Sequence, residues 1–318
     1  MGSEARVGGR EGAGLALSPF DPAGLVAYVD GDFVDAGQAR VSVFDHGLLY
    51  GDGVFEGLRL FSGSLFRPRD HLARLERSAR TLRLEVPLPA EELLAATIET
   101  VRRSRLADAH VRIVLTRGFG MPGLDPRRCE RPTLIVTAYP FPPFHGSKAL
   151  ELIVSSIPRK SPRSVGAHVK SLNYLDGVMA YQQATAAGAN DAIMLDVLGA
   201  VAECTAANLF FVVDGTLVTP TTRAALPGIT RRTVLELAGE LGIPAEEREV
   251  WPMELYSADA AFVTGSGAGV VPVASIDGHG IASEGDEIVA RLAAGYRART
   301  GDPDYLVPVG AEPALESA

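Results

Sequence analysis

The stretch Ala167 to Leu175, with the sequence AHVKSLNYL, carries one of only three lysines in a chain that has 27 arginines. The other two lysines are Lys148 and Lys160, so this chain makes little use of lysine as a surface residue. A partly desolvated amine can lose its proton and attack a carbonyl, whereas an arginine stays protonated and cannot form an imine. Lys170 is therefore a candidate for amine chemistry, and an ordinary surface lysine is the alternative.

Further features of the same half of the chain fit one ligand together with Lys170. Glu203, in GAVAECTAANLFFV, lies where a strand meets a polar turn. The segments LPGITRR (226–232) and TGSGAG (264–269) suit an anion, through free N–H groups at a helix start and small residues that let amides approach. Taken singly, LPGITRR is better explained by an ordinary threonine N-cap, and TGSGAG is equally well explained by a hairpin or bulge rich in glycine. Together, the amine, the carboxylate and the anion cradle are what pyridoxal phosphate (PLP) requires.

Strand and helix patterns alternate outward from this stretch and predict two lobes. Strands are expected at 27–34 (a pair), 54–61, 64–69, 111–117, 132–140, 150–157, 191–196, 208–215, 216–220, 260–265 and 270–275. Helices are expected at about 70–84, 90–105, 174–187, 230–241 and 284–299. The fold class is α/β (α+β). The predicted division is a disordered leader (1–24), a small N-terminal domain (25–140), an interdomain loop rich in Pro and Gly (141–149), a large C-terminal domain (150–300) and a tail (301–318).

Composition and charge exclude several classes of function. The chain has 318 residues, 47% of them hydrophobic and 22% charged, which is ordinary for a soluble protein with room for two domains. A formal net charge of −9 without any basic block argues against nucleic acid and anionic membranes as partners. The two cysteines and six histidines show no metal-ligand spacing, so no metal is expected.

The sequence does not favour a membrane protein or a secreted one. No apolar run approaches the length of a membrane span. The first 22 residues, MGSEARVGGREGAGLALSPFDP, lack the apolar core and cleavage site of a signal peptide. The expected compartment is the cytoplasm.

Two motifs that invite other functions are rejected. Gly118, Gly120 and Gly123 spell GxGxxG after a strand, but LDPRRCERP follows instead of a helix, so dinucleotide binding is not expected. Cys204 has no partner base that the sequence identifies, so it is not expected to be a nucleophile.

The chain resembles the class IV (fold-type IV) PLP-dependent aminotransferases. This family includes branched-chain and D-amino acid aminotransferases, aminodeoxychorismate lyases and (R)-amine transaminases. The matching stretches keep the order of the family from about Val26 to Arg299: VFDHGLLYGDGVFEGLR, HLARLERSA, VRIVLTRGFG with LDPRRC, VKSLNYL, GANDAIMLD, VAECTAANLF, LPGITRRTV and FVTGSGAGVVPV. The resemblance is closest to branched-chain enzymes. It implies a two-domain fold of the D-amino acid aminotransferase type, a homodimer, and PLP between the domains.

The resemblance implies a cofactor role for each matched residue. Lys170 resembles the Schiff-base lysine that also moves the substrate proton, and Glu203 resembles the acid paired with the pyridine nitrogen. Arg74 resembles the arginine that binds the phosphate, and its alternative is a surface partner for a neighbouring acid on its helix. Tyr174 resembles the tyrosine bonded to the phenolic oxygen, and a core helix tyrosine is its alternative. Leu226 resembles the residue packed on the ring, and the phosphate cup is matched by Gly228, Ile229, Thr230 and Ser266.

The substrate residues are implied in the same way. Tyr50, Phe55 and Gly57 resemble the wall of the side-chain pocket, contributed in part across the dimer, and plain core packing is the alternative for Phe55. Gly267 and Ala268 resemble the amides that receive the α-carboxylate. Arg112 resembles the arginine that accepts the side-chain carboxylate of glutamate or 2-oxoglutarate, and a strand-end salt bridge is its alternative.

The sequence departs from the branched-chain pattern near the substrate. His110 stands where these enzymes usually have tyrosine, and Gly269 stands where they usually have glutamate. ECTAAN replaces their Glu-Gly-x-Gly-Glu-Asn run. His110 can still donate a hydrogen bond, or give the pocket a pH-dependent charge.

The expected activity is transfer of an amino group between an aliphatic, branched-chain-like amino acid and 2-oxoglutarate. The alternatives are a D-amino acid or (R)-amine transaminase, an aminodeoxychorismate lyase, or a scaffold that binds PLP without catalysis.

Overall fold

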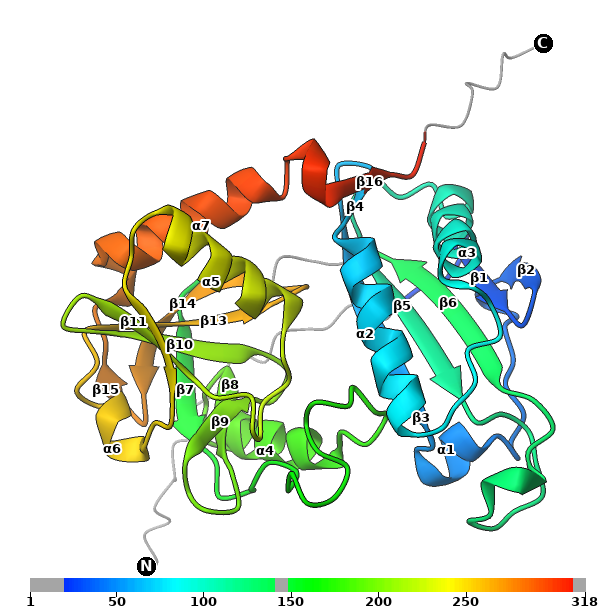
Figure 1. Ribbon diagram of the computed structural model, residues 1–318, viewed down its shortest axis with the longest axis horizontal. Coiled ribbons are helices and arrows are strands. Elements are labelled where there is room, and N and C mark those ends of the chain that lie inside the picture. Colours follow the sequence, from blue (N-terminus) through cyan, green and yellow to red (C-terminus); the bar gives the residue numbers. More distant parts are fainter. Residues whose placement is uncertain (1–19, 141–147, 311–318) are drawn as a thin grey trace, which may run out of the picture.

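The computed structural model describes residues 20–140 and 148–310, which form two lobes side by side (Figure 1). Each lobe is built around one β-sheet. Residues 1–19 of the predicted leader, 141–147 of the predicted interdomain loop and 311–318 of the predicted tail lie outside the described ranges. The division into domains therefore stays a prediction at these points.

The first lobe contains a seven-stranded sheet in which every pairing is antiparallel. Its strands, in order across the sheet, are β16 (Leu306–Pro308), β4 (Ser64–Phe66), β3 (Gly53–Phe61), β5 (Ala109–Thr116), β6 (Thr133–Tyr139), β1 (Val26–Val29) and β2 (Asp32–Asp35). Helices α2 (Pro68–Thr81) and α3 (Ala90–Arg103) pack on one face of this sheet, and the short helix α1 (His46–Tyr50) precedes β3 (Figure 1).

Strand alternation decides which side chains of this sheet are left for a site. Successive side chains of a strand point to opposite faces. In β3, Val54 and Leu58 belong to the core shared with α2 and α3, so Phe55 and Gly57 face the other way. The same rule places Val111 of β5 in the core. The face of the sheet away from α2 and α3 is thus the one that can carry a pocket.

The second lobe contains a nine-stranded sheet with both parallel and antiparallel pairs. Its main strands, in order, are β12 (Ala245–Arg248), β11 (Thr216–Pro220), β10 (Asn208–Val213), β13 (Ala260–Gly265), β14 (Gly269–Ile276), β7 (Leu150–Val154), β8 (Asp191–Leu195) and β9 (Val201–Cys204), and β15 (His279–Gly280) pairs with β14.

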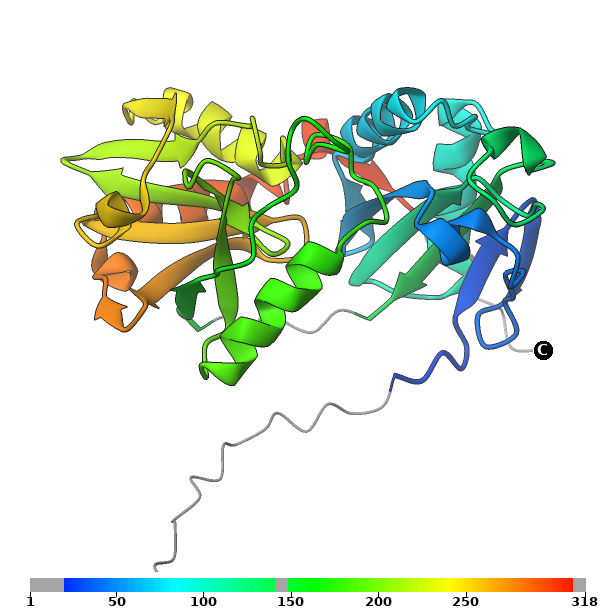
Figure 2. The same cartoon turned by 90° about the horizontal axis from the view of Figure 1, so that it is seen from below.

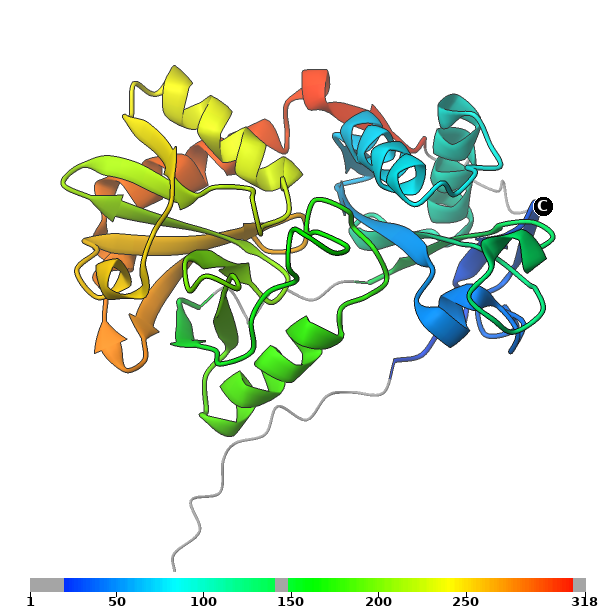
Figure 3. The ribbon, with the colours of Figure 1, turned by 60° about the horizontal axis from the view of Figure 1, so that its bottom comes forward.

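Three longer helices cover the second sheet. Helices α5 (Ile229–Glu240) and α7 (Glu287–Arg299) lie against each other over β13, and α4 (Leu175–Ala186) packs on β8 (Figure 2). The segment that precedes α4 runs between the lobes (Figure 3). The remaining short elements are α6 (Pro252–Leu255) and the 3-10 turns η1 (Pro126–Arg128), η3 (Ser283–Gly285) and η4 (Pro303–Tyr305).

The structure confirms the predicted fold class and corrects two local predictions. The strand expected over 64–69 ends at Phe66, because Pro68 begins α2 at a position where its missing N–H costs nothing. The tail expected from residue 301 is wrong for residues 303–308: they form η4 and β16, and β16 pairs with β4 in the first lobe (Figure 1). A strand of three residues is too short to give a periodic signal.

The described residues include neither a membrane-spanning helix nor a metal-binding cluster. No helix within 20–140 or 148–310 is long and apolar enough to cross a membrane. Over the same ranges, no group of three or more His, Cys, Asp or Glu side chains is placed to hold a metal ion.

Candidate active site

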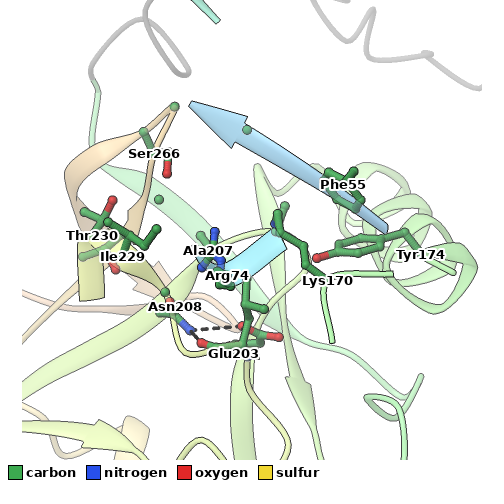
Figure 4. A pocket seen from close by; sticks show the side chains of 18 of the residues that line it. Phe55, Arg74, Lys170, Tyr174, Glu203, Ala207, Asn208, Ile229, Thr230 and Ser266 are labelled. Carbon is green, nitrogen blue, oxygen red and sulfur yellow. Dashed lines mark hydrogen bonds between the residues drawn. The ribbon is translucent and has the colours of Figure 1, made fainter. Parts of the chain in front are cut away.

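A cavity of about 340 Å³ lies between the two lobes and receives side chains from both (Figure 4). The predicted cofactor residues that line it are Arg74, Lys170, Tyr174, Glu203, Leu226, Gly228, Ile229, Thr230 and Ser266. The predicted substrate residues that line it are Phe55, Gly57, His110, Arg112, Gly267 and Ala268. Its volume lies in the usual range for a small-molecule site. The fold thus brings together residues that are up to 213 positions apart in the sequence (Phe55 to Ala268).

Lys170 is held in place by its backbone. Its carbonyl accepts a hydrogen bond from the N–H of Phe55 (2.9 Å), and its N–H donates to Oγ of Ser78 (3.2 Å). The next residue, Ser171, forms a bridge with Val54 of β3. Nζ of Lys170 lies 4.5 Å from the ring centroid of Phe55. The segment before α4 is thus tied to β3 by backbone contacts, which fix the position of the Lys170 backbone, and the Lys170 side chain lines the cavity.

The carboxylate of Glu203 is buried at the base of the cavity and accepts hydrogen bonds on both oxygens. Nε of Arg159 donates to Oε1 (2.9 Å), and Nη2 of the same guanidinium forms an ion pair with this oxygen (2.7 Å). Nδ2 of Asn208 (3.1 Å) and the N–H of Leu226 (3.0 Å) donate to Oε2. Figure 4 shows the contact of Asn208 with Glu203. Three hydrogen bonds and the ion pair keep this acid in one orientation, with one oxygen held by Arg159 and the other by Asn208 and Leu226.

Arg159 also reaches Tyr174, the other predicted partner of the ring. Its guanidinium donates to Oδ2 of Asp176 (3.0 Å) and lies 5.4 Å from the ring centroid of Tyr174. Burial alone would raise the pKa of Tyr174, but the positive charges of Lys170 and Arg159 lower it below the usual value for a tyrosine. The Tyr174 hydroxyl is therefore a stronger hydrogen-bond donor to an oxygen placed near it.

Arg74 is buried. The alternative, that it is a surface residue paired with a neighbouring acid on its helix, is therefore wrong. Glu56, itself fully buried, accepts hydrogen bonds from Nε (2.7 Å) and Nη2 (2.9 Å) of Arg74 and from Nδ1 of His71 (2.7 Å). Nη1 of Arg74 donates to the carbonyl of Pro227 (3.1 Å). The guanidinium is therefore anchored by an acid on β3 and touches the segment that leads into α5.

The N-terminus of α5 supplies an anion cradle opposite Phe55 and Tyr174 (Figure 4). Helix α5 begins at Ile229, and no side chain caps its first N–H groups. A Cβ at Gly228 would lie 2.0 Å from Oδ1 of Asn208, so only glycine fits there. The hydroxyls of Thr230 and Ser266 line the same part of the cavity. Free N–H groups at a helix start attract anions, and this group of donors fits a phosphate.

The glycine-rich segment forms the tight turn between β13 and β14, closed by the pair Gly265 and Gly269. The turn brings Gly267 and Ala268 into the cavity wall. Oγ1 of Thr264, at the end of β13, is buried and has no hydrogen-bond partner among the described residues. The turn therefore adds backbone amides and one unsatisfied hydroxyl to the polar side of the cavity.

Phe55, Arg112 and His110 form the wall on the first lobe. The guanidinium of Arg112 lies 3.7 Å from the ring centroid of Phe55, which packs edge-to-face on Tyr174 with centroids 5.2 Å apart. Phe55 is both buried and part of the cavity wall, so packing and pocket formation are not exclusive. Burial, followed by the positive charges of Arg112 and Arg59, lowers the pKa of His110 to about 4. Its imidazole is neutral at pH 7.

Tyr50 is the one predicted substrate residue that does not line the cavity. It ends α1, is 38% exposed, and accepts a hydrogen bond from the N–H of Gly123 (2.7 Å). It belongs to an exposed apolar surface that also includes Leu48 and Leu49 of the same helix. A part for Tyr50 in the pocket of a partner subunit stays a prediction.

The sequence did not identify three residues that the site depends on: Glu56, Arg159 and Asn208. Glu56 lies inside the quoted stretch VFEGLR, where an acid in a buried strand is a signal that could have been used. Arg159 gave no signal, because its loop PRKSPR looks like a solvated basic segment.

Cys204, beside Glu203, is buried, and burial raises the pKa of its thiol well above the usual value. Its rejection as a nucleophile agrees with this environment.

Comparisons with known proteins bear on this cavity. The family model described as amino-transferase class IV matches residues 53–276. A relative from Methanocaldococcus jannaschii is 46% identical over 252 residues, which are 79% of this chain and 88% of that protein. The branched-chain-amino-acid aminotransferase of Escherichia coli is 36% identical over 261 residues, which are 79% of this chain and 84% of that enzyme.

Solved structures agree in fold along most of the chain. The branched-chain aminotransferase of Thermoproteus uzoniensis with norvaline has a TM-score of 0.85 and 36% identity, and the match covers 90% of this chain and 99% of that chain. The branched-chain amino acid aminotransferase of Thermobaculum terrenum in its PLP form has a TM-score of 0.82 and 29% identity, covering 91% and 100%. The chain therefore belongs to the class IV aminotransferases and has the two-sheet architecture of fold-type IV enzymes.

Proposed function

We propose that the protein is a transaminase that moves an amino group between an aliphatic, branched-chain-like L-amino acid and 2-oxoglutarate, using PLP attached to Lys170. The observation that carries the proposal is one cavity that joins an amine, a buried carboxylate and an uncapped helix N-terminus. The names of the similar enzymes from E. coli and T. uzoniensis support the substrate class. The cytoplasmic location stays a prediction of the sequence.

The residues of the cavity fit PLP in three places. Arg74, Thr230 and the first N–H groups of α5 would hold the phosphate, and Thr264, whose buried hydroxyl has no partner among the described residues, lines the same cavity. Glu203 would face the ring nitrogen, with its carboxylate already oriented by Arg159. Leu226 and Tyr174 would contact the ring face and the phenolic oxygen, with the identities that the family resemblance implies.

When bound, PLP supplies an aldehyde that condenses with amines and a protonated pyridine ring that withdraws electrons from the substrate carbon. Lys170 would bind the aldehyde covalently, and its amine, when free, would move the proton of the substrate α-carbon. Glu203 would accept a hydrogen bond from a protonated ring nitrogen and so keep that proton in place. Phe55 and Tyr174 narrow the cavity and exclude water beside the amine.

The substrate would lie between the turn of the second lobe and the wall of the first. The amides at Gly267 and Ala268 would receive its α-carboxylate, and the apolar ring of Phe55 would receive an aliphatic side chain. Arg112 lies against Phe55 and is placed to pair with the side-chain carboxylate of glutamate or 2-oxoglutarate. One pocket can therefore accept both classes of side chain in turn.

Half-reactions of the purified holoenzyme test the substrate proposal. Single-turnover absorbance spectra are expected to show loss of the cofactor band with L-leucine, L-valine and L-glutamate, and no loss with D-alanine or an (R)-amine. Bleaching by the D-amino acid or the (R)-amine alone would replace the proposed substrate class by one of its alternatives. Release of pyruvate from aminodeoxychorismate without any amino acceptor would indicate the lyase.

Replacing Arg112 by methionine is expected to separate the two substrates. The variant should lose about 10- to 100-fold in kcat/KM for L-glutamate, because a charge-assisted pair contributes about 1.5–3 kcal/mol. It should change kcat/KM for L-leucine by only a few-fold, about the effect of a change in packing. The matched control is Arg69→Met, which removes an exposed arginine paired with Glu91 on the outer side of the first lobe. Equal losses for both substrates in Arg112→Met would contradict the assignment.

A homodimer is also proposed, because the described surface exposes apolar side chains over a continuous area. Leu48 and Leu49 of α1 are 67% and 40% exposed, and Leu175 and Val178 of α4 are 71% and 51% exposed. The two patches meet where Nδ2 of Asn173 donates to the carbonyl of Gly51 (3.0 Å). Apolar patches of this kind mark association sites.

Sedimentation tests the dimer. Sedimentation is expected to give the protein a mass of twice that of one chain, which is 33.5 kDa. Val178→Glu is expected to have the mass of a single chain, since it places a charge in the interface. The control is Ala290→Glu at an exposed position of α7, away from α1 and α4, which should leave the dimer intact. Sedimentation of the unaltered protein as a single chain would reject the proposal.

A further inference from the structure

Two arginines and a histidine gather on the cavity side of the first sheet. His110 and Arg112 are two residues apart on β5, so their side chains share a face, and both line the cavity. Arg59 of β3 lies opposite His110 in the strand register. A Cβ at Gly57 would come within 2.9 Å of Nε2 of His110, so the imidazole lies directly over this glycine in the cavity wall. The ring of Tyr139 on β6 closes the other side, with centroids 5.4 Å apart.

The groups around His110 keep its imidazole neutral while the cavity holds no anion. Charged or titratable neighbours come from every packed element: Arg59 on β3, Arg112 on β5, Tyr139 on β6, His71 on α2 and Lys170 before α4. Asp108 and Tyr296 lie near Arg59. Burial and then the nearby cations lower the pKa of His110 to about 4. A second carboxylate on a ligand would raise the pKa of His110, because its charge offsets the arginines and stabilises an imidazolium.

We propose that His110 takes up a proton when a keto acid with a side-chain carboxylate binds beside Arg112, so that the affinity for the acidic acceptor rises as the pH falls, while that for an aliphatic keto acid does not. The inference rests on the proposed function, since it takes 2-oxoglutarate as the acceptor. The proton comes from solvent and makes both ring nitrogens donors, including Nε2, which lies next to Gly57 in the cavity wall. By linkage, a group whose pKa rises on binding makes binding tighter below the pKa of the complex. His110 thereby acts as a specificity-determining residue.

The test compares two keto acids bound to the PLP form of the holoenzyme, in which neither ligand can react because the cofactor carries no amino group. Calorimetry in buffers of different ionisation enthalpy counts the protons taken up with 2-oxoglutarate and with 4-methyl-2-oxopentanoate, between pH 6.0 and 8.0. The aliphatic ligand has the same α-keto carboxylate, so it corrects for any proton taken up at the cofactor. His110→Gln, which keeps a polar side chain that does not titrate, is compared with the unaltered protein.

For the unaltered protein, 2-oxoglutarate is expected to take up about one proton more than the aliphatic ligand near pH 6, and its Kd should rise about tenfold from pH 6 to pH 8. His110→Gln should bind 2-oxoglutarate with no extra proton and with the pH dependence of the aliphatic ligand. Tight binding without an extra proton, or an extra proton that persists in His110→Gln, overturns the inference and leaves the proposed function intact. Binding of the aliphatic ligand alone would instead reject 2-oxoglutarate as the acceptor, and the inference with it.

Discussion

Lys170→Ala is expected to lower kcat by about 10⁴-fold, because one amine both holds the cofactor and moves the substrate proton, and proton transfer alone contributes about 10²- to 10⁴-fold. The variant should fold normally. The hydrogen bonds to Phe55 and Ser78 use backbone atoms of residue 170, which alanine keeps. The cofactor should still bind, through Arg74 and Glu203, but without a covalent bond. Kinetics, thermal unfolding and the absorbance spectrum of the variant measure these three effects.

The matched control is Lys148→Ala, because Lys148 is exposed and does not line the cavity. It removes an amine from a chain that has only three lysines and should leave kcat unchanged. Loss of activity in both variants, or a Lys170→Ala protein that turns over at the unaltered rate, would contradict the role of Lys170.

Glu56→Gln is expected to have the largest effect on stability, lowering the free energy of unfolding by about 3–5 kcal/mol, because it leaves a buried guanidinium without its counter-charge. The carboxylate of Glu56 is fully buried and accepts hydrogen bonds from both Arg74 and His71. Burial alone would raise the pKa of Glu56, but Arg74 and His71 hold it well below its usual range. Since Arg74 is the predicted phosphate ligand, the variant should also bind PLP more weakly.

The sign of the pH effect follows from that lowered pKa. The stabilisation by Glu56 is present above the pKa of an unfolded glutamate, about 4.3, and is lost as the pH falls through the folded pKa. The difference in unfolding free energy between the unaltered protein and Glu56→Gln should therefore narrow below about pH 4.

The control for this prediction is Glu99→Gln on α3, whose carboxylate pairs with Arg102 and Arg103 at the surface. Exposed pairs contribute about 0–1 kcal/mol, so the control should lose no more than that. Chemical denaturation of the three proteins over a pH series is the measurement. Equal losses at Glu56 and Glu99 would mean that the buried pair does not support the fold.

The sequence predicted the fold well where long elements repeat a clear period. β5 and β6 alternate buried and partly buried residues along most of their length, and α2 carries Leu72 and Leu75 on its core face, so the types of these elements could be predicted from hydrophobic spacing. β16 could not, since its three residues are stabilised by pairing with β4 and not by a pattern of their own. Long-range pairing of that kind leaves no trace in local sequence.

The candidate site was predictable only in part. Lys170 and Glu203 were identified because together with an anion cradle they fit one ligand, whereas Arg74 was identified only because its segment resembles a family. Arg159 was missed because a buried arginine and a surface arginine look alike in sequence, and only the fold shows that it reaches Glu203. Tyr50 lies on the exposed apolar surface of this chain, so its part in the pocket of a partner subunit stays a prediction.

The central claim is that the amine of Lys170 holds PLP. Reduction of the holoenzyme with borohydride, followed by tryptic peptide mapping, tests it most directly, because reduction makes the bond permanent and a modified lysine is not cleaved. The expected product is one labelled peptide that spans residues 164–223, with cleavage missed only at Lys170. A label on Lys148 or Lys160, or no label at all, would contradict the account.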